Sequence, residues 1–338
     1  MDRLSDDLPM RTVQSDIIGG ERLSSLNGSP LLFCDLGRQW SRAVEGGILI
    51  GIDREGRVPE LAASDFDVLI TTESTAAAPW VVVGPDRLDA QLQIVALTAE
   101  KSPIASAMLA RVLRLQEALD FDSALEVESL AYSTLLGGSE FAQWARESAG
   151  ASSASQAPEP VHYDRAGDAV TLILQSAGNH NAMTAAMRDA LYEALVNVLE
   201  DPSLPAVTLR GEGKCFSTGG DLGEFGTARD LAQAHIIRTQ RSCARLLHRL
   251  GARATVRLHG ACIGSGIEVP AAAARRVGSR DSFFQLPELK MGLIPGAGGT
   301  VSIGHAIGRH RLMWMCLGAF RIDARQALDW GLLHEIEQ

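Results

Sequence analysis

The sequence predicts an α/β fold in its second half, and three observations support this prediction. Short β-rich apolar runs, such as 169-AVTLIL-174, alternate with amphipathic helical patterns, which is typical of layered α/β domains. Glycines gather in three separate clusters along the same half. The whole chain has 46% hydrophobic and 21% charged residues, a composition that supports a sizeable core.

The elements of this half follow from their hydrophobic spacing. A helix is predicted where leucines recur every four residues, because that spacing gives one buried stripe. Asp323 is expected to cap a last helix that runs through Leu328. In chain order, the patterns predict strands over 169–174, 206–210 and 254–260 and helices over 183–199 and 229–250.

The first half has a different organisation. Three apolar runs between residues 46 and 83, GILIGI, DVLITT and WVVV, predict a small sheet, and residues 86–148 have helical spacing. The stretch 149-AGASSASQAPEP-160 is small and polar, as linkers are. We therefore divide the chain into an N-terminal region (1–148), a linker (149–160) and a core (161–338).

Composition also excludes several classes of function. The net charge of −10 argues against nucleic acid as a partner, because phosphate binding needs clustered Lys and Arg. No apolar run approaches the roughly 20 residues that span a bilayer, and the acidic start MDRLSDDLPM lacks the apolar core of a signal peptide. A cytoplasmic location without a membrane partner is the expectation.

Cysteine and histidine spacing gives no metal site. The cysteines are odd in number and form no CxxC pair, so each is expected to be a buried, reduced thiol. His259 has no second histidine at metal-ligand spacing and is expected to pack or hydrogen-bond at the end of a strand. The five cysteines are Cys34, Cys215, Cys243, Cys262 and Cys316.

The glycine clusters are the chemistry-bearing stretches. They are 211-GEGKCFSTGGDLGEF-225, 259-HGACIGSGIEV-269 and 287-PELKMGLIPGAGGT-300, and the last two carry Glu268 and Glu288. Glycine weakens regular structure, so such clusters need a reason: either tight turns for packing, or close approach of a ligand to main-chain amides. The GxGxxG look-alikes lack the context of a dinucleotide fold, and no GxxxxGK[ST] loop occurs.

Taken together, these stretches resemble the crotonase superfamily, the enoyl-CoA hydratase/isomerase family. The resemblance implies a crotonase-like (ββα) spiral core, an α/β fold with a helical tail, joined here to a small α/β N-terminal region. The matching stretches keep the order of the family: 181-NAMTAAMRDAL-191, 216-FSTGGDL-222, 259-HGACIGSGIE-268, 287-PELKMGLIPGAGGT-300 and 328-LDWGLLHEI-336.

The resemblance implies two kinds of catalytic group. Two backbone N–H groups, of Gly220 and Ser265, would hold the oxygen of a thioester enolate, and such donors are often the largest single contribution to catalysis. Ser265 departs from the glycine that is commoner there. Glu268 and Glu288 would hold a water between them, one activating it and the other delivering a proton.

The resemblance also implies the ligand. The partner would be an acyl-CoA substrate, with coenzyme A entering only as part of the substrate and with no separate cofactor or metal. Lys214 is a candidate phosphate partner, although a solvated surface lysine is the simpler interpretation. Family members assemble, so a homotrimer or hexamer is expected. The candidate substrate contacts are Ala182, Ser217, Thr218, Gly219, Asp221, Leu222, Ile263 and Gly264.

One departure concerns the helical tail. A typical crotonase continues after WGLLHEI with helices that cover the acyl pocket, whereas 102-SPIASAMLARVLR-114 and 124-ALEVESLAYSTLLGGSEFAQWARE-147 resemble that tail ahead of the core. We therefore predict a permuted crotonase whose helices over 102–147 lie near Glu268. The rival interpretation is an unrelated accessory domain over 1–148. The runs before residue 90 match nothing we can place.

Three functions follow. The leading one is a lyase of the enoyl-CoA hydratase type, which adds water to a trans-2-enoyl-CoA or dehydrates a 3-hydroxyacyl-CoA. The second is double-bond isomerisation, or a specialised reaction on an aromatic or cyclic acyl-CoA. The third is a non-catalytic scaffold of the same fold, against which the retention of both Glu268 and Glu288 counts.

Overall fold

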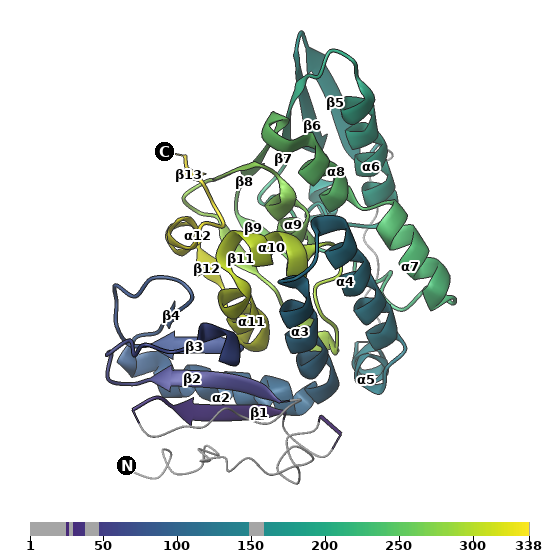
Figure 1. Cartoon of the computed structure of the whole chain (residues 1–338). Coiled ribbons are helices and arrows are strands. Elements are labelled where there is room, and N and C mark those ends of the chain that lie inside the picture. Colours follow the sequence, from purple (N-terminus) through teal and green to yellow (C-terminus); the bar gives the residue numbers. More distant parts are fainter. Residues whose placement is uncertain (1–24, 27–29, 38–46, 149–158, 338) are drawn as a thin grey trace.

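A computed structural model describes residues 25–26, 30–37, 47–148 and 159–337 of the chain (Figure 1). Most of the predicted linker, residues 149–158, lies outside the described residues. No described helix is both long and apolar enough to cross a membrane.

The N-terminal region contains the small sheet that the apolar runs predict. Its four strands are parallel and follow chain order. The sequence predicts three of them, and the first was missed. The strands are β1 (Leu31–Asp35), β2 (Ile48–Asp53), β3 (Val68–Thr71) and β4 (Val81–Val82).

Helices follow this sheet, as the spacing over 86–148 predicts. The side chain of Asp120 caps α4 by accepting a hydrogen bond from the N–H of Ser123 at 3.0 Å, which satisfies one of the free donors at a helix start. The helices are α2 (Pro85–Lys101), α3 (Pro103–Gln116), α4 (Phe121–Leu136) and α5 (Ser139–Glu147).

Two sheets form the core. The six-stranded sheet has the order β13-β10-β8-β7-β6-β5 and the three-stranded sheet the order β12-β11-β9. The strands are β5 (Val161–Ala166), β6 (Ala169–Leu174), β7 (Ala206–Gly211), β8 (Ala254–Leu258), β9 (Ala261–Ile263), β10 (Arg275–Gly278), β11 (Phe283–Gln285), β12 (Ile322–Asp323) and β13 (Glu335–Ile336).

Successive strand pairs divide between these sheets. β8 and β10 belong to the larger sheet, whereas β9 and β11, which follow them directly, belong to the smaller one. A helical segment comes after each pair, so the chain winds as repeated ββα units. This winding is the crotonase-like spiral that the resemblance implies. The helices of the core are α6 (Ala185–Glu200), α7 (Leu231–Gln240), α8 (Cys243–Leu250), α9 (Ser265–Glu268), α10 (Gly299–Ile307), α11 (Arg309–Gly318) and α12 (Ala324–Trp330).

The predicted long helix over 229–250 is wrong, because two helices stand there. α7 ends at Gln240, and Ser242 starts α8 by accepting a hydrogen bond from the N–H of Arg245 at 3.2 Å. Serine is a favoured N-cap, so this local signal outweighs the continuous apolar pattern. The predicted cap at Asp323 is confirmed, since its side chain accepts from the N–H of Gln326 at 2.8 Å.

The N-terminal helices lie against the core, not apart from it. In Figure 1, α3 stands beside α10 and α11, and α4 stands beside α10 and also contacts α7. Gln116 of α3 donates to the hydroxyl of Thr300 in α10 at 2.6 Å. Arg309 of α11 is buried and donates to the carbonyl oxygens of Ser64 and Phe66, next to β3. One hydrophobic core therefore runs through both regions of the chain.

Candidate active site

A buried asparagine brings the glycine-bearing segments together. Asn181 has no exposed surface, and its amide nitrogen donates to the carbonyl oxygens of Glu212 (2.9 Å), Cys215 (3.2 Å) and Phe216 (3.0 Å). The N–H of Ile263 in turn donates to Ser217 at 3.1 Å. Because buried polar groups are costly when unpaired, these bonds fix the three segments in one register.

Glycine is required where these segments touch. Gly219 has a φ of +89°, and a Cβ there would lie 2.6 Å from the carbonyl oxygen of Ile263. Gly264 has a φ of +50°, and a Cβ there would lie 2.7 Å from Oε1 of Glu288 and 3.9 Å from Oε1 of Glu268. The two predicted glutamates therefore approach the same point beside Gly264.

Two backbone N–H groups in this region have no partner among the described residues. Those of Gly220 and Ser265 donate to nothing there, and both residues line the same cavity. Ser265 is the first residue of α9, where a helix leaves its N–H groups unused. Its buried hydroxyl also lacks a hydrogen-bond partner.

Glu268 and Glu288 are both buried and differ in their contacts. Oε2 of Glu268 accepts from the N–H groups of Ala297 (2.7 Å) and Gly299 (3.1 Å), whereas Oε2 of Glu288 has no hydrogen-bond partner among the residues that the structure describes. Burial, with the charges of Glu288 and Glu128, raises the pKa of Glu268 well above its ordinary value. Burial raises the pKa of Glu288 to about 8. Neighbouring carboxyls of this kind favour a state with one proton between them.

A third carboxyl, from α4, was missed by sequence reasoning. Glu128 is 1% exposed and accepts from the N–H groups of Gly298 (2.7 Å) and Thr300 (2.8 Å). Burial raises its pKa to about 7. The available signal was a glutamate three residues after Leu125, on the buried stripe of a helix.

The cavity has a volume of about 590 Å³ and extends from the two glutamates to α4 and α7. Tyr132 of α4 packs its ring against Gly296, where a Cβ would overlap the ring. The guanidinium of Arg238 in α7 lies 4.5 Å from the centre of the same ring. Both side chains line the cavity, and neither was predicted.

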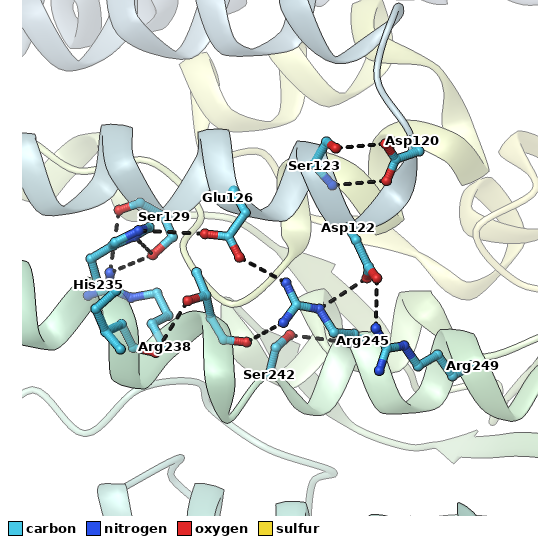
Figure 2. Close-up of polar contacts among 12 residues, drawn as sticks. Asp120, Asp122, Ser123, Glu126, Ser129, His235, Arg238, Ser242, Arg245 and Arg249 are labelled. Carbon is cyan, nitrogen blue, oxygen red and sulfur yellow. Dashed lines mark hydrogen bonds and ion pairs between the residues drawn. The ribbon is translucent and has the colours of Figure 1, made fainter.

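A row of polar contacts holds α4 against α7 and α8 (Figure 2). Arg245 donates to Asp122 (3.0 Å) and Glu126 (3.1 Å), and Arg238 donates to the hydroxyl of Ser129 at 3.0 Å. These contacts run along one side of α4, so its other cavity-lining residues are held in place.

The predicted substrate contacts fall in different environments. Asp221 lines the cavity with Gly220 and Ser265. Ser217 is fully buried and donates to the carbonyl oxygen of Asn181 at 2.7 Å, so its side chain stabilises the turn. Leu222 is exposed. Ala182 and Gly264 are buried, while Thr218 and Ile263 are half-buried; Gly219 is buried beneath Ile263.

The remaining residues singled out from the sequence have these positions. Lys214 is exposed and outside the cavity lining. The ring of His259 bonds the carbonyl oxygen of Gly213 at 3.1 Å, as expected for a strand end. All five cysteines are buried and unpaired.

Fold and site together define a class: an α/β spiral that places paired carboxyls and two free backbone N–H groups in one cavity. Residues 166–337 match the family model described as enoyl-CoA hydratase/isomerase. The chain belongs to the enoyl-CoA hydratase/isomerase family.

Individual relatives share part of the chain. It is 27% identical over 161 residues to the "Probable enoyl-CoA hydratase" of Bacillus subtilis (strain 168), covering 46% of this chain and 62% of that protein. It is 29% identical over 166 residues to the fatty acid oxidation complex subunit alpha of Shewanella sp. (strain W3-18-1), covering 46% and 23%. The chain thus spans less than two thirds of the length of these relatives.

Solved structures are also similar to part of the chain. The enoyl-CoA hydratase from Thermoplasma volcanium GSS1 is similar with a TM-score of 0.49 and 26% identity, covering 53% of this chain and 72% of that one.

Proposed function

We propose that this protein is an acyl-CoA-binding lyase that adds water to a trans-2-enoyl-CoA, or removes it from a 3-hydroxyacyl-CoA. The observation that carries the proposal is the pair Glu268 and Glu288, whose oxygens meet beside Gly264 in a cavity that also contains two free N–H groups.

The N–H groups of Gly220 and Ser265 would bind the thioester oxygen. Negative charge moves onto that oxygen when water adds at the β-carbon, so donors directed at it stabilise the enolate. Gly220 carries no side chain to obstruct the ligand, and its own Cβ would collide with the ring of Phe225. The side chain of Ser265 adds an unpaired hydroxyl to the same wall.

The contacts of the two glutamates suggest a division of roles. Burial and the neighbouring carboxyls raise the pKa of Glu268, but it accepts two backbone N–H groups, which stabilise its ionised form and oppose that rise. Glu288 has an oxygen without a donor and a pKa raised to about 8 by burial, which favours its protonated form. Glu268 would therefore take a proton from water while the water oxygen forms its bond to the β-carbon. Glu288 would deliver its proton to the α-carbon, and the proton on Glu268 returns to Glu288 before the next cycle.

The ligand is an acyl-CoA, and coenzyme A enters only as part of the substrate in this proposal. We also propose that α3, α4 and α5 take the place of the helical tail that follows the core in other crotonases. The residues of α4 in the cavity wall, Glu128 and Tyr132, support this second proposal.

A second candidate is double-bond isomerisation, or a specialised reaction on an aromatic or cyclic acyl-CoA. The third carboxyl of the cavity, Glu128, favours this candidate, because an isomerase moves a proton from one carbon to another and does not add water. Glu128 is one more group in the cavity that can carry such a proton. A scaffold without turnover is the non-catalytic alternative.

Hydration of enoyl-CoA thioesters of several chain lengths by the purified full chain tests the proposal. Glu268→Gln and Glu288→Gln should each lower the rate by about 10²- to 10⁴-fold, as loss of a general acid or base does. Glu193→Gln, an exposed residue on α6, is the matched control. The hydratase proposal fails if no thioester is hydrated or if Glu288→Gln is as active as the wild type. Isomerised product without 3-hydroxyacyl-CoA would support the second candidate.

A further inference from the structure

Arg238 is an unusual cation for the wall of a largely acidic cavity. Four arginines line the cavity. Arg188 and Arg241 each pair with Asp189, at 2.8 and 3.5 Å, and Arg229 is exposed. Arg238 is half-buried, yet no carboxylate of the described residues lies within the 4.0 Å that defines an ion pair.

The hydrogen bonds of Arg238 use only one of its three nitrogens. Nη1 donates to the hydroxyls of Ser129 (3.0 Å) and Ser133 (2.9 Å) and to the carbonyl oxygen of Ser129 at 3.4 Å. Within the described part of the chain, Nε and Nη2 donate to nothing. Neutral hydroxyls orient the guanidinium without cancelling its charge, and a partly buried charge favours an anionic partner.

The position of Arg238 relates it to the candidate site. Its guanidinium stacks on the ring of Tyr132, and the same ring packs on Gly296, the start of the turn that holds Glu268. Arg238 and the glutamate turn thus contact the same aromatic ring. A group bound by Arg238 would belong to the far end of an acyl chain whose thioester lies by Gly220 and Ser265.

We propose that Arg238 recognises a carboxylate at the far end of the acyl group, so that the substrates are CoA thioesters of dicarboxylic acids. This rests on the proposed function for the placement of the thioester. The planar guanidinium presents Nε and Nη2 side by side, which is the geometry that binds a carboxylate through two parallel hydrogen bonds. Four glutamates and two aspartates also line the cavity, so a carboxylate is more favourably placed beside Arg238 than beside these acidic residues.

The test is calorimetric binding of saturated thioesters, which does not require turnover. Succinyl-, glutaryl- and adipyl-CoA are compared with butyryl-, pentanoyl- and hexanoyl-CoA of equal chain length. We expect at least one dicarboxylic thioester to bind about tenfold tighter than its partner, as charge-assisted hydrogen bonds do. Arg238→Met should reduce that ratio to below about twofold, and Arg238→Lys should retain part of it.

Arg245→Met is the matched control. Like Arg238, Arg245 bonds to α4, in its case through Asp122 and Glu126, but it lies outside the cavity lining. Its loss removes one positive charge and one contact to α4, so a merely structural role of Arg238 predicts equal effects of the two variants. The binding ratio of the Arg245→Met protein should equal that of the wild type.

The outcomes separate this inference from the proposed function. Ratios near one for all three pairs in the wild type overturn the inference, even if enoyl-CoA is hydrated; this comparison needs no variant to fold. Equal weakening of free CoA and every thioester by Arg238→Met also overturns it, because Arg238 would then bind the phosphates. A tenfold ratio that depends on Arg238, without hydration, supports the inference and refutes the hydratase proposal. Absence of all thioester binding refutes both.

Discussion

Glu128 and Glu268 bind alternate N–H groups of one turn. Glu268 accepts from Ala297 and Gly299, and Glu128 accepts from Gly298 and Thr300. The two carboxyls come from α4 and α9, which lie on opposite sides of the predicted linker in the sequence. The turn at 296–300 therefore couples the position and the ionisation of both glutamates.

Loss of the Glu128 charge should shift the pH dependence of hydration. The charge of Glu128 raises the pKa of both Glu268 and Glu288. In Glu128→Gln the alkaline limb of the kcat/KM profile should therefore move to lower pH. Glu126 lies on the same helix and its side chain is 44% exposed, so Glu126→Gln should leave the alkaline limb in place. Identical limbs in Glu128→Gln and the wild type contradict the coupling.

The kcat/KM of the wild-type protein should decrease at alkaline pH. Glu288 has a folded-state pKa of about 8 and is protonated below it. If Glu288 is the acid, kcat/KM falls as the pH rises through about 8. Initial rates between pH 5 and 10 measure this. A rate that keeps rising above pH 9 would exclude Glu288 as the acid.

Stability should depend on pH through the same group. A raised carboxyl pKa means that the native state binds the proton more tightly than the unfolded chain. The unfolding free energy then falls as the pH rises from the ordinary glutamate value, about 4.3, towards about 8. Urea denaturation at pH 5 and pH 8 measures the difference. In Glu288→Gln this decrease should be smaller, and an equal decrease in both proteins would assign it to other groups.

Gly264→Ala should impair activity beyond its effect on folding. The backbone of Gly264 lies in a sparsely populated region with positive φ, where alanine costs about 1–3 kcal/mol, and the new Cβ would lie 2.7 Å from Oε1 of Glu288. Gly251 has a φ of +56° with nothing within 4 Å of the Cβ position, so Gly251→Ala reproduces the backbone strain alone. Both variants should unfold at lower urea concentration, and only Gly264→Ala should lose hydration activity. Equal activities would show that Glu288 moves aside freely.

Arg309→Met should weaken the attachment of the N-terminal sheet. The buried guanidinium donates to Glu117 (2.8 Å) and to the carbonyl oxygens of Phe66 (2.7 Å) and Ser64 (3.2 Å). Its removal leaves these acceptors unpaired, which should lower the unfolding free energy by about 3 kcal/mol. Arg325→Met, at an exposed position on α12, should change it by no more than about 0.5 kcal/mol. A change of that small size in Arg309→Met would refute the role of this contact.

The sequence predicts the parts of the fold that depend on local spacing. The strand over 169–174 and the cap at Asp323 are confirmed because alternation and capping act within a few residues. The break at Ser242 is equally local and was overlooked. Glu268 and Glu288 were identified from their motifs, and the structure places them together.

The residues of the cavity wall were beyond prediction for a physical reason. Glu128, Tyr132 and Arg238 acquire their surroundings only when α4 packs on α7 and on the turn at 296–300. The spacing of α4 places Glu128 on the buried stripe but does not show which groups it would bind there. Only the pairing of distant segments decides between them.

The sharing of the turn at 296–300 has a consequence for how the protein is made. Glu128 is 170 residues ahead of Gly298, so α4 leaves the ribosome long before its hydrogen-bond donors exist. Contacts between such distant segments form slowly, because a long loop must close first. Until that segment has been synthesised, Glu128 on the apolar stripe of the nascent α4 can bind only water or other partners.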